Sequence, residues 1–256
     1  MGPLLFCLTV QPLLTLCDTE LKIGYLDDFT LGDQPLKVAT ELARLEERAL
    51  DLGLSININK CEVISASSSS DLPVSLKRFK RVSVAQGCLL GSPLSEGVAM
   101  DEALNSRIEA LQVASTRLRL LQAHDALIIL KFSMSLPSLL HILRSAPCSG
   151  HPSLPIFDEA LRASLSSVLN VALDDTQWSQ ASLPVREGGL GVRSAVHLAP
   201  SAFLASANAS APLTSAILAT FGSNSPLAIL IPDTTVSLQA WVALGGGDPD
   251  SVKLEG

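Results

Sequence analysis

Two adjacent aspartates, Asp27 and Asp28, interrupt an alternating apolar run near the start of the chain. Neighbouring carboxylates repel each other, and a divalent cation is the usual compensation, because hard ions such as Mg²⁺ prefer oxygen ligands. In nucleotidyl transfer, two such ions neutralise the charge that develops on the attacking and leaving oxygens. Asp is also common in solvated turns, so the dipeptide alone favours an ordinary polar turn.

The residues around the pair predict a β-hairpin that holds both carboxylates at its tip. Leu21, Ile23 and Tyr25 alternate with smaller or polar residues, which is the period of a half-buried strand. A second β-favouring run, 29–31, follows the aspartates and ends at Gly32. Residues 3–16 before the hairpin are predicted to form a helix.

The next segment predicts a helix followed by a strand. Apolar residues at spacings of four and three form one stripe, and charged residues including Glu41 are expected on the other side. The stripe consists of Val38, Leu42, Leu45, Ala49 and Leu52. Gly53 is placed to end this helix, and alternation from Ile56 to Ile64 predicts a strand.

Beyond residue 64 the chain changes character. Residues 65–73 are rich in serine and predict a surface loop. From about Met100 the spacing of apolar residues is helical, and a further helix is expected over 156–173. We therefore expect an α+β fold, with an α/β part at 1–95 and an all-helical part at 96–256.

Composition sets limits on the protein class. The chain has 256 residues, 47% of them hydrophobic and 17% charged, which is enough apolar material for a sizeable core. The five cysteines form no close pair, which fits a reducing, intracellular compartment, cytoplasm or nucleus. Prolines 200, 212 and 226 are expected to cut the uncharged stretch 194–232 into pieces too short to span a membrane. The net charge of -7 means that any surface for nucleic acid must be local.

Several segments together resemble the reverse transcriptases of non-LTR retrotransposons, over roughly residues 2–200. Tyr25-Leu26-Asp27-Asp28-Phe29 looks like the YxDD box of that family. The other similar pieces, in order, are Gly2-Pro3-Leu4-Leu5-Phe6, Leu52-Gly53-Leu54 with Asn57, Asn59, Lys60 and Cys61, Leu89-Leu90-Gly91-Ser92-Pro93-Leu94, and Leu183-Pro184-Val185 with Gly188-Gly189-Leu190-Gly191.

The resemblance implies an RNA-directed DNA polymerase, with a partial palm followed by a thumb-like region. Asp27 would be the principal Mg²⁺ ligand and Asp28 a supporting one, while Tyr25 and Phe29 would position the turn. Lys60 would approach the incoming nucleotide, and Leu90-Gly91 would lie in the primer-grip hairpin. The partners implied are an RNA template and a DNA primer.

The family's first catalytic aspartate lies upstream of the segment with which this chain starts. The fingers and that aspartate have no counterpart here, so the resemblance implies a truncated fragment with an incomplete two-metal site. We expect it to be inactive alone, and a partner that supplies the missing polymerase half is an open alternative.

The basic cluster Lys77, Arg78, Lys80 and Arg81, with Phe79 among them, could grip nucleic-acid phosphates or be a solvated loop. The four histidines show no metal-ligand spacing, and Asp174-Asp175 lacks a flanking strand. Two other functions stay open: a non-catalytic nucleic-acid-binding or protein-interaction remnant, and a degenerate element whose open sheet edge promotes aggregation.

Overall fold

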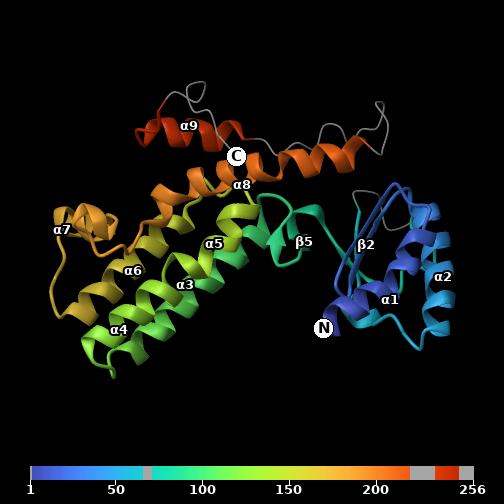
Figure 1. Ribbon diagram of the computed structural model, residues 1–256, viewed down its shortest axis with the longest axis horizontal. Helices are drawn as coiled ribbons and strands as arrows, with labels where there is room; N and C mark the ends of the chain where they lie inside the picture. The colour runs from blue at the N-terminus through green and yellow to red at the C-terminus, as the bar shows by residue number, and fades with distance from the viewer. Residues whose placement is uncertain (1, 66–70, 220–233, 248–256) are drawn as a thin grey trace. The chain divides into compact units, whose positions relative to one another are not determined.

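A computed structural model of the protein describes residues 2–65, 71–219 and 234–247 (Figure 1). The chain divides into two compact units, Met1–Val84 and Ala85–Gly256. The described residues are mostly helical, with small sheets of two strands each, which agrees with the expected α+β class. The hairpin of β5 (Cys88–Leu89) and β6 (Ser92–Pro93) therefore belongs to the second unit.

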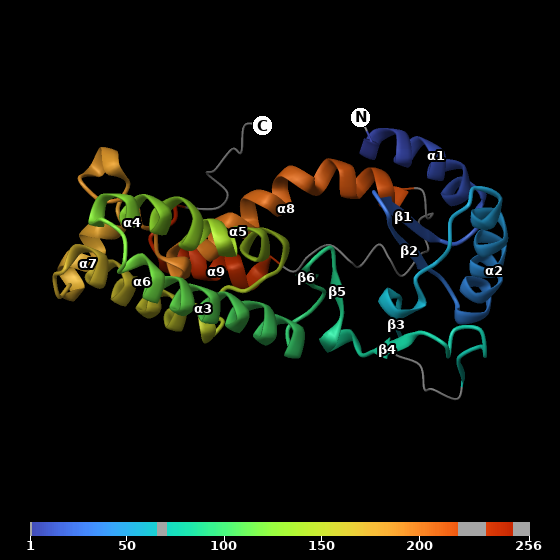
Figure 2. The ribbon, with the colours of Figure 1, turned by 90° about the horizontal axis from the view of Figure 1, so that it is seen from below.

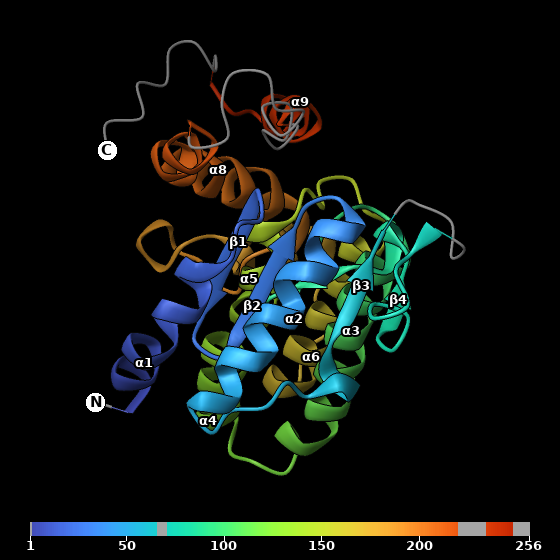
Figure 3. The same ribbon diagram turned by 90° about the vertical axis from the view of Figure 1, so that its right-hand side faces the viewer.

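The first unit begins with a helix, a hairpin and a second helix, as the sequence predicted. These elements are α1 (Gly2–Leu16), β1 (Leu21–Tyr25), β2 (Asp28–Gly32) and α2 (Pro35–Asp51). The helices α1 and α2 contact each other, and α1 contacts β1 (Figure 3). Val10, Leu13 and Ala49 form a small core there, with Phe29 packed against it.

The strand predicted over 56–64 is mostly wrong. Only β3 (Glu62–Ile64) is extended, and it pairs in parallel with β4 (Lys80–Val82). The residues before it form the 3₁₀ turn η1 (Ile58–Lys60), closed by a hydrogen bond from the Lys60 N–H to the Asn57 carbonyl. Asn favours such local turns, and this preference outweighed the alternation of apolar residues. Part of the predicted serine-rich loop, 66–70, lies outside the described residues.

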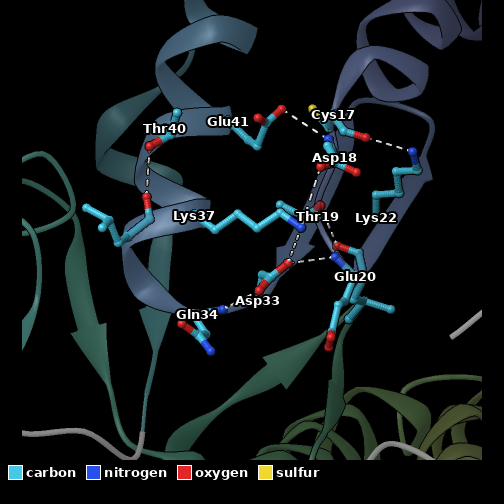
Figure 4. A network of polar contacts seen from close by, with 12 residues as sticks. Cys17, Asp18, Thr19, Glu20, Lys22, Asp33, Gln34, Lys37, Thr40 and Glu41 are labelled. Carbon is cyan, nitrogen blue, oxygen red and sulfur yellow. Dashed lines mark hydrogen bonds and ion pairs between the residues drawn. The ribbon is translucent and has the colours of Figure 1, made fainter. Parts of the chain in front are cut away.

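The predicted helix stripe is confirmed in α2 except at Leu52, which is the C-cap and is 43% exposed, and Glu41 is not on the exposed side. Its side chain is buried, and its carboxylate accepts a hydrogen bond from the Asp18 N–H at 3.0 Å and is bound by Arg44 (Figure 4). The Asp18 backbone bond, opposed by burial and aided by Arg44, lowers the pKa of Glu41. The Glu41 carboxylate can be buried because the Asp18 N–H and the Arg44 guanidinium both donate hydrogen bonds to it.

A second carboxylate, Asp33, fixes the same open end of the hairpin to α2 (Figure 4). Asp33 accepts hydrogen bonds from the backbone N–H groups of Glu20 and Gln34, and it forms an ion pair with Lys37 at 3.2 Å. Burial alone would raise the pKa of Asp33, but these bonds outweigh it and lower the pKa.

The second unit is a helical bundle that follows the β5–β6 hairpin. Its elements are η3 (Val84–Gln86), which overlaps the boundary, β5 (Cys88–Leu89), β6 (Ser92–Pro93), α3 (Val98–Leu118), α4 (Ala123–Ile129), the π-helix η4 (Leu130–Met134), α5 (Leu136–Ser145), α6 (Ser153–Leu169), α7 (Asp175–Ser182), η5 (Val185–Glu187), α8 (Ala195–Ala219) and α9 (Thr235–Ala243). Figure 2 shows α3 and α6 side by side, and α8 packs against α5 and α9.

One large core holds this bundle together. Leu104, Leu139, Leu143, Leu161 and Leu165 are each at most 1% exposed and belong to one contiguous cluster. They come from α3, α5 and α6, whose inward-facing leucines share one interior.

Two prolines do not interrupt α8, contrary to expectation. Pro200 and Pro212 lie inside a continuous helix of 25 residues. A proline inside a helix costs about 3 kcal/mol because a hydrogen bond is lost. Burial of Ala195, Ala199 and Phe203 opposes that cost around Pro200. The third proline of that prediction, Pro226, lies outside the described residues.

One helical stretch in the described part of the chain, Ala123–Ser145, is long and apolar enough to cross a membrane, with a mean hydropathy of 1.8. In the bundle, Leu130, Leu139 and Leu143 from this stretch are fully buried against other helices. The core helices of a globular domain share these properties, so this stretch is weak evidence for a membrane.

Candidate metal centre

The tip of the β1–β2 hairpin is a two-residue turn. Tyr25 pairs with Asp28, which leaves Leu26 and Asp27 as the central residues. Leu26 has a φ of 57° and Asp27 does not have a positive φ, which is the pattern of a type II′ turn. Glycine usually occupies the first central position, because a side chain there is strained. Backbone strain of this kind clusters at functional sites.

Both aspartates of this turn are exposed. Within the part of the chain that the structure describes, neither carboxylate has a hydrogen bond or an ion pair. The cation on the same hairpin, Lys22, donates to the Cys17 carbonyl at 2.7 Å. The mutual repulsion of the two carboxylates is therefore met by solvent alone.

The two faces of the hairpin differ. Gly24 and Phe29 share one face, and a Cβ on Gly24 would lie 3.1 Å from both the Leu14 side chain and the Phe29 ring. This face packs on α1, and Phe29 anchors the turn there. Tyr25 and Asp28 share the opposite face, where Tyr25 is 58% exposed. Phe29 thus packs against the small core of the first unit, and Tyr25 flanks the carboxylates in the open.

The donor set fits one hard cation. Mg²⁺ keeps several of its waters and is commonly held by one or two carboxylates, and Asp27 and Asp28 supply two that are exposed and unpaired. Across 2–65, 71–219 and 234–247, no three His, Cys, Asp or Glu side chains gather to hold a metal. Two ions would require more ligands than these two carboxylates.

Lys60, the expected nucleotide-contacting lysine, is the last residue of η1 and is exposed. It forms no hydrogen bond or ion pair with either aspartate in the described chain. The structure therefore does not bring Lys60 into contact with the carboxylate pair.

The basic cluster is partly neutralised by nearby acids. Arg78 pairs with Glu46 and stacks on the Phe79 ring at 4.7 Å. Lys80 pairs with Glu62 at 2.8 Å. Phe79 is 8% exposed and packs in a small core, so its ring is not available for stacking on a base. Lys77 and Arg81 are both exposed.

The predicted primer-grip segment forms the β5–β6 hairpin of the second unit. Leu89 pairs with Ser92, and the turn residues Leu90 and Gly91 have φ values of 50° and 77°. Two positive φ values define a type I′ turn. The His141 ring nitrogen Nε2 lies 3.1 Å from the Leu90 carbonyl oxygen. Sequence reasoning missed His141, because nothing in the local sequence links α5 to this turn.

A buried polar cluster was also missed. The Asp158 carboxylate accepts hydrogen bonds from the Ser194 hydroxyl and from the N–H groups of Ala195, at 2.6 Å, and Val196. The His197 ring nitrogen Nδ1 lies 2.9 Å from the same hydroxyl. In a hydrolytic triad the histidine lies between the serine and the carboxylate. Here Ser194 lies between Asp158 and His197, and it is only 5% exposed, so the order of a triad is not present. This cluster caps α8.

Four further residues that the sequence singled out lie at helix ends or in an ion pair. Asp174 caps α7 in a capping box with Gln177, and Asp175 pairs with Arg162 at 2.7 Å. His124 lies in the first turn of α4. Gly188, with a φ of 83°, ends η5.

Comparison of the chain with protein-family models, with curated proteins and with solved structures found no match.

Proposed function

We propose that this chain is a portion of a reverse-transcriptase core of the non-LTR retrotransposon type, in which Asp27 and Asp28 bind Mg²⁺. The observation that carries the proposal is the strained turn at Leu26, which exposes two adjacent carboxylates without partners. A folded chain keeps such an arrangement when something else uses it, and a divalent cation is the natural ligand.

Each residue of the turn has a role in this proposal. Asp27 is the principal ligand and Asp28 the supporting one, while Phe29 fixes the turn on α1. The bound cation supplies neutralisation of negative charge on a phosphoryl group. The order of the segments that resemble the family, from the first helix to the β5–β6 hairpin, supports the palm and thumb-like assignments.

Metal binding tests the site directly. Mn²⁺ titration should broaden the amide NMR signals of Leu26 and Asp27 through its unpaired electrons. We expect this broadening to disappear in Asp27→Asn/Asp28→Asn. The matched control is Asp51→Asn, an exposed carboxylate of α2 in the same unit. Broadening that is absent, or that survives the double substitution, would contradict the proposal.

Primer extension tests the activity. We expect the purified chain to add no nucleotides to a primer on an RNA template, because two carboxylates hold fewer ions than the reaction needs. Extension that Asp27→Ala abolishes would refute the inactivity of the isolated chain while supporting the family assignment.

A second candidate is a non-catalytic nucleic-acid-binding remnant, favoured by the exposed side chains of Lys77, Arg78, Lys80 and Arg81. It predicts weak, salt-dependent binding of oligonucleotides that is lost when all four residues are replaced. The ion pairs of Arg78 and Lys80 with Glu46 and Glu62 count against it, because paired cations neutralise fewer phosphates.

A further inference from the structure

The second unit contains a groove of about 730 Å³ between α5, α8 and the loop around η5. On α5 it is lined by Leu136, Leu140 and Arg144, which recur every four residues and so lie on one face. On α8 it is lined by Leu198, by the small residues Ser201, Ala202 and Ala205, and by Ser206. The small side chains of α8 leave the space open.

The apolar lining is exposed to solvent. Phe132 is 66% exposed, Val185 63% and Leu140 37%. An apolar groove with exposed side chains is the kind of surface into which an amphipathic helix docks. Because one side of the groove is open, its occupant must cover these side chains and present a polar face of its own to water.

The charges along the groove have one sign. Lys131, Arg144 and Arg193 line it, and no Asp or Glu does. Within the described chain none of these three cations forms an ion pair, and Lys131 lies 5.2 Å from the centre of the Phe132 ring. The protein as a whole carries a net charge of -7, so this concentration of cations is a local exception.

We propose that this groove binds an acidic amphipathic helix of a partner protein. The apolar face of such a helix would cover Phe132, Leu140 and Val185, and its carboxylates would pair with Arg144 and Arg193. A single nucleic-acid strand fits less well, because it needs ring faces for stacking and Phe132 is the one aromatic residue in the lining. The proposal does not depend on the metal centre, which lies in the other unit.

The test uses the full chain and a fluorescent peptide of about 15 residues, long enough to form a helix. Its leucines are spaced i, i+3, i+4 and i+7, with glutamates beside them. A peptide of the same composition, scrambled so that the leucines share no face, is the control ligand. We expect saturable binding of the first peptide that is at least ten-fold tighter than that of the scrambled one.

Charge reversal locates the site. Arg144→Glu/Arg193→Glu should weaken binding by at least ten-fold at low salt. The control Arg117→Glu/Arg119→Glu makes the same change in charge on exposed residues of α3 and its C-cap and should leave affinity unchanged. Ala202→Trp, which fills the groove without changing charge, should also weaken binding. Circular dichroism checks that each variant is folded.

Three results would overturn the proposal. The first is equal affinity for the two peptides, and the second is an equal loss of affinity in the α3 control variant. The third is tighter binding of a single-stranded oligothymidine or of anionic phospholipid vesicles, if the groove variants abolish that binding. The last result would assign the groove to nucleic acid or to a membrane.

Discussion

The two units are held together in different ways. The second has one contiguous apolar core, in which residues such as Leu161 and Leu165 are fully buried. The first has two small clusters of three buried residues each, and the carboxylates of Glu41 and Asp33 join its elements. Apolar burial scales with the area removed from water, whereas carboxylate hydrogen bonds depend on ionisation. The stability of the first unit should therefore be lower and more sensitive to pH.

The largest expected effect is in the large core. Leu161→Ala should destabilise the second unit by about 3 kcal/mol, because it removes buried surface and leaves a cavity. Both tryptophans lie in this unit and Trp178 is packed against the core, so its fluorescence during denaturant unfolding reports the change. Leu120→Ala, at a residue that is 85% exposed, should have little effect. A loss of similar size in both variants would show that the cluster is not the source of stability.

Glu41→Gln should lower the free energy of unfolding of the first unit by about 1.5 kcal/mol, because the hydrogen bonds from the Asp18 N–H and Arg44 lose their charged acceptor. The effect should depend on pH. The pKa values of Glu41 and Asp33 are lowered from 4.5 and 3.8, so their contribution is complete above those values and is lost as pH falls through the folded-state pKa. Hydrogen exchange of the α2 amides between pH 7 and pH 3 measures this loss of stability. Glu47→Gln, a substitution of an exposed residue, is the control. A pH response unchanged by Glu41→Gln would contradict this account.

Two buried cysteines allow a direct comparison of the units. Burial raises the pKa of both the Cys17 and the Cys148 thiol, the latter to about 11, so both react mainly after local opening. We expect Cys17, in the first unit, to be alkylated at least ten-fold faster than Cys148, because a difference of 1.4 kcal/mol in opening free energy gives that factor. Mass spectrometry of peptides measures both rates, and rates in denaturant provide the correction for intrinsic reactivity. Equal corrected rates would mean that the units open together.

The smallest expected effect concerns the strained turns. Leu26→Gly should stabilise the first unit by about 1 kcal/mol, since the left-handed region costs a leucine roughly that much. Leu90→Gly makes the matched change in the β5–β6 turn, and hydrogen exchange of the hairpin amides reports both. A loss of stability in Leu26→Gly would show that the leucine side chain has a contact that outweighs the strain.

The sequence predicted those elements whose apolar residues follow a single clear period. The helix α2, the helix α3 that contains Met100 and the hairpin around Asp27 were predicted correctly, because their periods of 3.6 and 2 are local properties. The features that failed depend on contacts between distant residues. Glu41 is buried by Asp18, α8 continues through Pro200 because it packs on other helices, and the groove exists only where α5 meets α8. Of the candidate site, the hairpin was predictable, whereas the strain at Leu26 was not.

The cap of α8 has a consequence for the order of events in folding. Asp158 lies 36 residues before Ser194, so the bonds that it accepts from the Ser194 hydroxyl and the Ala195 and Val196 N–H groups form only after α6 has formed and the intervening segment has closed. Loop closure has an entropic cost, which makes docking of α8 a late step. The groove between α5 and α8 therefore exists only once α8 has docked, and the Asp158 carboxylate is one of the groups that stabilise the docked helix.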